Sequence, residues 1–106
     1  MNMKFKYLYR DGSNYKQFNE VVFANLNNLT LKEIEEVIKE NLIDSQWFVA
    51  RDWGLTDLHF KEYAWDSEID HSWHEFESIE ETLELVTTEN DIVGFLVQVN
   101  KTKPPW

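Results

Sequence analysis

The chain of 106 residues contains no cysteine, only three glycines and two prolines, and no long hydrophobic run. Without cysteine there is no disulfide framework and no thiolate for catalysis or metal binding. So few glycines exclude a phosphate-cradling loop or a dinucleotide-binding fingerprint. No stretch approaches the ~18 apolar residues of a membrane span, and residues 1–5 lack the apolar run of a signal peptide. We therefore expect a cytoplasmic protein that does not insert into a membrane.

Basic residues are also scarce, because 10 Lys and Arg stand against 20 Asp and Glu and the formal net charge is −10. A basic patch for phosphate contacts is missing, so the charge argues against a nucleic-acid partner and suits a basic protein instead. Residues 51–91 hold 13 of the 20 acidic residues, all three histidines and three of the five tryptophans. This composition predicts an acidic, aromatic surface built from that stretch.

The N-terminal third predicts a β-hairpin. Phe5, Tyr7 and Tyr9 alternate with the basic residues Lys4, Lys6 and Arg10, and a run rich in Val and Phe follows at residues 18–24. Period-two alternation is typical of a half-buried strand, and the Asp-Gly-Ser-Asn sequence at residues 11–14 is typical of a turn. Further strands are predicted at residues 47–50 and 58–63, on either side of a turn at residues 52–55, and residues 72–77 are a candidate strand.

The helix predicted at residues 31–42 has the clearest signals in the chain. Thr30 and Glu33 match the T-x-x-E pattern of a capping box. Ile34 and Ile38 belong to an apolar stripe at helical spacing, which should face the sheet. These motifs explain folding, and none of them implies chemistry.

Two later segments carry weaker helix signals. Ser78 and Glu81 repeat the capping pattern and predict a short helix at residues 79–86. Residues 91–100 fit either a helix or a strand, because apolar residues fall at both spacings. The helix is favoured here, since Thr88 and Asp91 are residue types that cap helices.

These elements predict one α+β domain over residues 1–100, followed by a tail at residues 101–106. The N-terminal hairpin would be extended into a small, mainly antiparallel sheet. The helix at residues 31–42 would pack on one face of this sheet, with the C-terminal helix as a second helical element.

The histidines are the candidates for a transition-metal site. Zinc takes three or four N, O or S ligands, and His71 and His74 would share a face on a helix. On a strand they would point to opposite faces, and the segment contains no H-E-x-x-H pattern. We expect no such site. The alternative is that both are surface histidines bonded to nearby carboxylates.

The same acidic stretch imitates a calcium loop. Six side chains fall at EF-hand spacing, namely Asp66, Glu68, Asp70, Ser72, His74 and Glu77. His71 occupies the position that requires glycine, and the flanking sequence indicates strands instead of helices. Carboxylate pairs for acid–base catalysis arise by chance in so acidic a segment, and a G-x-S-x-G nucleophile motif is absent. We therefore predict no cofactor, and we favour a protein that is not an enzyme.

The tryptophans offer two interpretations. Trp47 and Trp53 would belong to the core with Trp73 half-buried, or Trp65 and Trp73 would stand on the acidic surface as binding anchors. Aromatic side chains ringed by charge are typical of interface hot spots. The predicted binding surface therefore consists of Asp57, Trp65, Asp66, Glu68, Asp70, Trp73, Glu75 and Glu77.

Four segments are similar to a group of small, acidic, single-domain bacterial proteins to which no function is assigned. They read YRDGSNYK, EVVFANLNNLTLKEIEEVIKENLID, DWGL and DHSWHEFE, and the likeness covers about residues 5–97. The resemblance implies a bacterial and cytoplasmic protein. It implies no catalytic residue.

The favoured hypothesis is non-catalytic binding of a basic protein, as by an immunity protein, an antitoxin or an inhibitor. The first alternative is a metal-binding protein or metal-dependent hydrolase that uses His71, His74 and nearby carboxylates. The second alternative is a structural homodimer.

Overall fold

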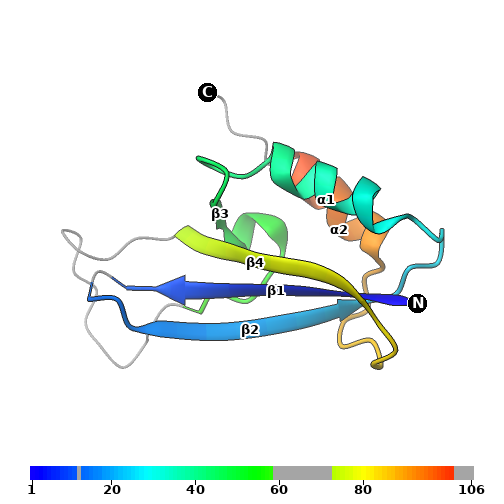
Figure 1. The fold of residues 1–106 in the computed structure, drawn as a ribbon, viewed down its shortest axis with the longest axis horizontal. Helices are drawn as coiled ribbons and strands as arrows, with labels where there is room; N and C mark the ends of the chain where they lie inside the picture. Colours follow the sequence, from blue (N-terminus) through cyan, green and yellow to red (C-terminus); the bar gives the residue numbers. More distant parts are fainter. Residues whose placement is uncertain (12, 59–72, 102–106) are drawn as a thin grey trace.

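Strands β1 (Asn2–Arg10) and β2 (Lys16–Phe23) form the N-terminal antiparallel hairpin that the sequence predicts (Figure 1). The computed structural model describes residues 1–11, 13–58 and 73–101. After the hairpin come α1 (Leu31–Glu40), β3 (Trp47–Val49), the short 3-10 helix η1 (Ala50–Trp53), β4 (Trp73–Thr82) and α2 (Ile92–Lys101). The four strands form one antiparallel sheet in the order β2-β1-β4-β3, so the fold is α+β as expected.

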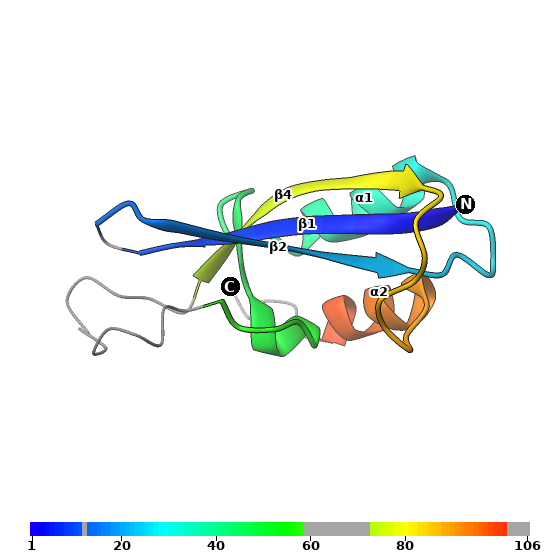
Figure 2. The ribbon, with the colours of Figure 1, turned by 90° about the horizontal axis from the view of Figure 1, so that it is seen from below.

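Both helices lie on the same side of this curled sheet, above the strands in Figure 1, and Figure 2 shows the sheet from below. We call the sheet face toward the helices the inner face and the opposite one the outer face. Met3, Phe5, Tyr7 and Tyr9 alternate along β1 and are fully or almost fully buried in the inner-face core. The core therefore lies between the sheet and the helices, and none of the described helices covers the outer face.

Helix α1 begins as predicted. Thr30 Oγ1 accepts the amide hydrogen of Glu33, and the Glu33 carboxylate accepts that of Thr30, so both halves of the capping box are formed. Ile34 and Ile38 are completely buried. The helix ends at Glu40, two residues before its predicted end, and Asn41 forms its C-cap.

The C-terminal segment is a helix, as favoured from the sequence. Its four buried side chains are Ile92, Phe95, Leu96 and Val99, the set at helical spacing. Asp91 Oδ1 accepts the amide hydrogen of Gly94 at 2.9 Å, which is the N-capping bond expected of Asp91. The Ile92 amide also donates to the Ala24 carbonyl, so the start of α2 is fixed to the chain just after β2.

The short helix predicted at residues 79–86 is wrong, because residues 73–82 form β4. This strand lies in the middle of the sheet and pairs with β1 and β3, and those ladder bonds outweigh the local S-x-x-E signal. Ile79 and Leu83, which would share one face of a helix, are 4% and 85% exposed, so no buried helix face exists here. Residues 73–77 of the candidate strand at residues 72–77 are the part of β4 that the sequence did indicate, and residue 72 lies outside the described residues.

The remaining predicted elements are confirmed in part, and some of them lie outside the described residues. β3 confirms the strand expected near residues 47–50, and η1 with Gly54 forms the turn expected at residues 52–55. Leu58 belongs to no strand. Residues 59–63 of the predicted strand lie outside the described residues, as do residues 64–72, for which the acidic sequence indicates a loop. Helix α2 reaches Lys101, the first residue of the predicted tail.

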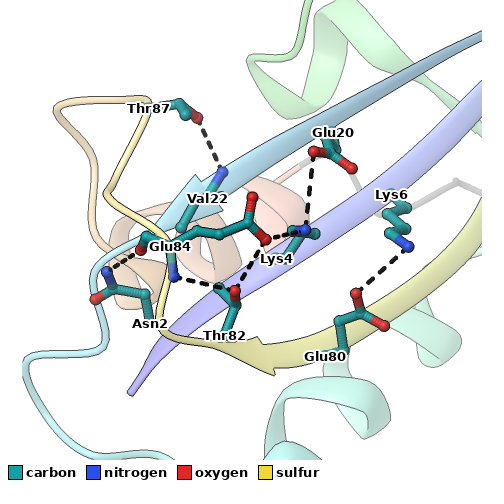
Figure 3. Close-up of polar contacts among 9 residues, drawn as sticks. All are labelled: Asn2, Lys4, Lys6, Glu20, Val22, Glu80, Thr82, Glu84 and Thr87. Atoms are coloured by element: carbon teal, nitrogen blue, oxygen red, sulfur yellow. Dashed lines mark hydrogen bonds and ion pairs between the residues drawn. The ribbon is translucent and has the colours of Figure 1, made fainter.

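At one end of the outer face, residues 83–88 cross from β4 to the edge of β2, and we call them the strap (Figure 3). The Glu84 carboxylate contacts Lys4 of β1, and the Glu84 carbonyl accepts a hydrogen bond from Asn2. Thr87 accepts the Val22 amide hydrogen and donates its own to the Val22 carbonyl. The strap therefore covers this end of the outer face and occupies the edge of β2 at Val22.

Candidate functional site

The opposite end of the outer face carries a hollow of about 510 Å³, which we call the Trp hollow. It is lined by Arg10, Gln46, Trp47, Trp73 and Glu75. The two indole rings are stacked with their centroids 5.5 Å apart and their planes 28° from parallel. Trp73 is 39% exposed and Trp47 is half-buried, so part of the aromatic surface is accessible to solvent.

The strand register explains why these side chains meet. Trp47 of β3 is directly opposite Glu75 of β4, and Val49 is opposite Trp73. Trp47 and Trp73 are therefore diagonal neighbours on one face of an antiparallel pair, close enough for large aromatic rings to touch. Glu75 is also opposite Leu8 of β1, two residues before Arg10. Residues from three strands thus converge on one surface.

Arg10 and Glu75 form a two-pronged ion pair in the floor of the hollow. Arg10 Nε donates to Glu75 Oε2 at 2.8 Å, and Nη2 donates to Oε1 at 3.3 Å. Nη1 donates to Asn14 Oδ1, so all three guanidinium nitrogens are held. The hydrogen bonds to Glu75 raise the pKa of Arg10 further above its ordinary value. Both charges are fixed in place and largely offset each other.

The structure describes four of the eight predicted surface residues, and they do not form one patch. Trp73 and Glu75 lie in the Trp hollow. Glu77 is the extra residue of a bulge in β4, because Phe76 and Ser78 are opposite the consecutive residues Tyr7 and Lys6 of β1; Glu77 is exposed. Asp57 is on the inner side, 3.5 Å from His74 and 3.8 Å from Arg51. Trp65, Asp66, Glu68 and Asp70 lie outside the described residues.

His74 is a buried residue of the inner face and not a surface histidine, which corrects that interpretation. It is 1% exposed and packs between the rings of Tyr9 and Phe48. Its Nε2 accepts the backbone hydrogen of Leu58 at 2.9 Å, so this nitrogen carries no proton and its lone pair is engaged. His71, the other candidate ligand, lies outside the described residues.

The calcium-loop spacing also fails where it can be followed. His74 is buried near the start of β4 and Glu77 follows it in the same strand, so this half of the segment is not a loop. Within residues 1–11, 13–58 and 73–101, no group of three or more His, Asp or Glu side chains is placed to hold a metal ion.

A second hollow, of about 300 Å³, opens beside the inner side of β2. Glu20 is the one titratable residue that lines it, and the others are polar uncharged or apolar. Beside it the Tyr7 hydroxyl donates to the Thr56 carbonyl at 2.7 Å and accepts from the Asn19 side chain at 3.1 Å. Burial raises the pKa of Tyr7. The hydroxyl is a structural tether for residue 56 and stays protonated at neutral pH.

Sequence reasoning missed Arg10 and Gln46 as site residues and assigned Trp47 to the core. Trp47 is half-buried, whereas Trp53 is 4% exposed and belongs to the core as expected. Arg10 lies 65 residues before Glu75, and Trp47 lies 26 before Trp73, so no local motif joins them. The signal that was available is that Trp47 and Trp73 each belong to a predicted strand.

Neither described helix is long and apolar enough to cross a membrane. Comparison with known proteins found no family model, no curated protein and no solved structure that matches this chain, so the resemblance to small bacterial proteins remains a prediction.

Proposed function

We propose that this protein is a non-catalytic protein-binding module and that the Trp hollow is the anchor of its binding surface. The observation that carries the proposal is the stacked pair of half-buried Trp47 and exposed Trp73 on a sheet face that none of the described helices covers. Large exposed aromatic surfaces on a soluble domain mark sites where another molecule binds. We further propose that the protein acts in the cytoplasm.

The chemistry of the hollow suits a protein partner. Tryptophan and arginine are the residue types most enriched at the energetic centres of interfaces. Each Trp can remove on the order of 150–250 Å² from water while little side-chain freedom is lost. Arg10 is already held by Glu75 and Asn14, so it needs little ordering when a partner docks beside it. A partner that inserts an aliphatic or aromatic side chain between these groups would exclude water from the ion pair.

The partner we propose is basic, because the chain carries a net charge of −10. The described charges of the outer face are mostly paired, as in Lys6 with Glu80 and Arg10 with Glu75. The net charge therefore acts at long range: it accelerates encounter with a basic protein by one to three orders of magnitude, and salt weakens the effect. An immunity protein, antitoxin or inhibitor that masks a basic target would use both the anchor and the charge.

The alternative of a metal-dependent hydrolase gains no support from His74, whose Nε2 accepts the Leu58 amide hydrogen in the core. The case for binding rests on exposed groups of the outer face instead.

The test compares capture of host proteins by immobilised native chain, by Trp73→Ala and by Leu85→Ala. Leu85 is 87% exposed and belongs to the strap, which contacts Lys4 and Val22 at the other end of the sheet, so its variant removes an exposed apolar side chain away from the hollow. We expect one basic protein to be retained by the native chain and by Leu85→Ala and lost from Trp73→Ala. The retained protein, once purified, should bind Trp73→Ala at least about tenfold more weakly, mainly through a faster off-rate.

Loss of binding must not reflect unfolding, so the melting temperature of each variant is measured alongside. Trp47→Ala serves as a second probe of the same hollow. Equal retention of the partner by the native chain and by both Trp variants would contradict the proposal, as would a retained partner of acidic character.

A further inference from the structure

We propose that the protein forms a homodimer in which β2 pairs with β2 of a second copy, antiparallel and centred on Phe18. The evidence is a self-complementary segment on a free strand edge. This inference does not depend on the Trp hollow, which is lined by residues of β1, β4 and the β3 edge of the sheet and by no residue of β2.

Strand β2 is an edge of the sheet, because it pairs with β1 on one side and has no strand on the other among the described residues. The direction of its backbone groups follows from Val22. Val22 donates to and accepts from Thr87 of the strap, so its amide and carbonyl point away from β1. In an antiparallel ladder these directions alternate along the strand. The amides and carbonyls of Lys16, Phe18 and Glu20 therefore also point outward, that is, away from β1 and within the plane of the sheet.

None of the described residues bonds to those outward groups of Phe18 and Glu20. The free edge has definite ends. At one end Thr87 forms hydrogen bonds with the amide and carbonyl of Val22. At the other end the strand stops at Lys16, next to a turn in which Asn14 has a φ of +68°. The free edge thus runs from Lys16 to Val21. An unpaired edge of this kind is a template for another strand.

The sequence along this edge complements itself. Residues 16–20 read Lys-Gln-Phe-Asn-Glu, so an antiparallel copy centred on Phe18 sets Phe18 against Phe18, Lys16 against Glu20 and Gln17 against Asn19. Lys16, Phe18 and Glu20 share the outer face with the buried Val22, by strand alternation. Phe18 is 60% exposed, and the Glu20 side chain is 51% exposed although it lies 3.8 Å from Lys4. Opposite charges and paired aromatics are the cross-strand pairs that stabilise sheets.

The backbone directions fit the same register. Residues whose amides and carbonyls both point outward must meet one another as hydrogen-bonded pairs. Phe18 against Phe18 and Lys16 against Glu20 satisfy this rule, and Val22 is not needed. A register shifted toward Val22 would have to displace Thr87. A register shifted the other way would set Glu20 against Asn14, which lies in the turn.

The test uses charge exchange at the two positions that face each other. A dimer in this register contains two pairs between residue 16 of one copy and residue 20 of the other. In Lys16→Glu both residues of each pair would be acidic, and in Glu20→Lys both would be basic. Each single variant should raise the dissociation constant of the dimer by about tenfold or more. A mixture of the two variants restores an acidic residue opposite a basic one at both positions. The mixture should therefore form a heterodimer about as tightly as the native chain forms its homodimer.

Matched controls carry the same charge changes elsewhere. Lys32→Glu and Glu36→Lys alter exposed residues of α1, so both should dimerise like the native chain. Dimer content is measured by sedimentation equilibrium at physiological ionic strength, and the mixed species by native mass spectrometry with one chain tagged. Amide exchange provides an independent readout: the Phe18 and Glu20 amides should slow as chain concentration rises, whereas those of Gln17 and Asn19 are already bonded to β1.

A monomeric native chain at all accessible concentrations would overturn the proposal. So would a dimer that survives both single charge changes, because it would use another surface. Single variants that are monomeric but do not pair when mixed would also overturn it. A peptide strand of another protein is the competing occupant of this edge, and protection of Phe18 only when such a protein is added would favour that occupant over a second copy.

Discussion

Two buried polar side chains of the inner face hold residues 54–58 beneath the sheet. The Tyr7 hydroxyl donates to the Thr56 carbonyl, and His74 Nε2 accepts the Leu58 amide hydrogen. Leu55 and Leu58 are 8% and 6% exposed, so this irregular segment forms part of the core. Buried backbone groups need partners, and here side chains of β1 and β4 supply them.

The first prediction concerns His74. Replacing it with Phe keeps a ring of similar size in the core but leaves the Leu58 amide without its acceptor. We expect His74→Phe to lower the free energy of unfolding by about 1–3 kcal/mol. Urea titration measures the loss, and amide exchange should show Leu58 opening faster than the rest of the core. Glu77→Ala, on the same strand but exposed, should change stability by no more than about 0.5 kcal/mol. Slow exchange of Leu58 in His74→Phe would show that this hydrogen bond is unimportant.

A second prediction concerns Glu84 and the dependence of stability on pH. Hydrogen bonds from Lys4 and then Thr82 lower the pKa of Glu84. A carboxylate whose pKa is lower in the folded than in the unfolded chain stabilises the fold above the unfolded value, near pH 4–5, and loses that effect as pH falls through the folded value. Native chain should therefore exceed Glu84→Gln in stability at pH 7. The difference should shrink progressively below about pH 5.

Melting curves of both chains between pH 7 and pH 3 measure this effect. Glu36→Gln, an exposed helix residue, is the control and should follow the native chain across the range. A gap between native chain and Glu84→Gln that stays constant with pH would contradict the ion pair with Lys4 as its source.

The helix α1 allows a test of packing and capping in one element. Ile38 is completely buried against the sheet, so Ile38→Ala should cost roughly 2–4 kcal/mol. Thr30→Ala removes one capping bond and should cost about 1 kcal/mol. Glu36→Ala, on the exposed side of the same helix, should cost little. Denaturant titration of the three variants should give this order, and equal losses for Ile38→Ala and Glu36→Ala would contradict the packing.

The elements that sequence alone could predict are those specified by their own residues. The Thr30 box and the Ile34/Ile38 stripe define α1 locally, and the alternation around Phe5 defines β1. Thr88 and Asp91, as candidate caps, favoured a helix for the C-terminal segment although the apolar spacing was ambiguous, and Asp91 accepts the capping bond. β4 was misjudged beyond Glu77 because its conformation depends on β1, whose paired residues lie 72 (Lys6–Ser78) to 80 (Asn2–Thr82) positions earlier in the chain. Non-local pairing of this kind leaves no short-range pattern.

Only part of the candidate site could be predicted from the sequence, because its residues also meet through pairing between distant strands. Trp73 and Glu75 were named as surface residues, and the structure sets them together. Asp57 was grouped with them by its charge and position in the sequence, yet it lies on the inner side beside His74. An acidic composition shows which segment of the chain is charged, but it does not show on which face of the sheet each residue lies. The face depends on the parity of each strand residue and on the bulge at Glu77, which only the sheet register reveals.

For the whole molecule, the proposed dimer would join two four-stranded sheets into one of eight strands. Because Phe18 of each copy would meet on the outer face, both outer faces would point to the same side. The two Trp hollows would then be displayed together, one on each side of the dimer axis. A partner with two matching sites would bind such a dimer by avidity, with an apparent affinity 10²–10⁴ times that of one hollow.

The net charge of the chain leads to the last prediction. Two copies of charge −10 with centres about 30 Å apart repel by about 14 kcal/mol without screening, about 5 kcal/mol at 0.01 M salt and less than 1 kcal/mol at 0.15 M. The exposed Lys16–Glu20 pairs contribute at most about 1 kcal/mol each, so repulsion dominates at low salt. The homodimer should tighten as salt rises to physiological strength, whereas binding to a basic partner should weaken.

Sedimentation equilibrium across this salt range measures the first trend, and the association rate with the captured partner measures the second. Glu36→Lys combined with Glu40→Lys is the control, because both residues are exposed on α1 and the change reduces the net charge from −10 to −6. Repulsion scales with the product of the two charges, so the control should dimerise more tightly than native chain at 0.01 M salt and about equally at 0.15 M. A native dimer that tightens steadily as salt is removed would mean that attraction across the interface exceeds the repulsion between two acidic chains.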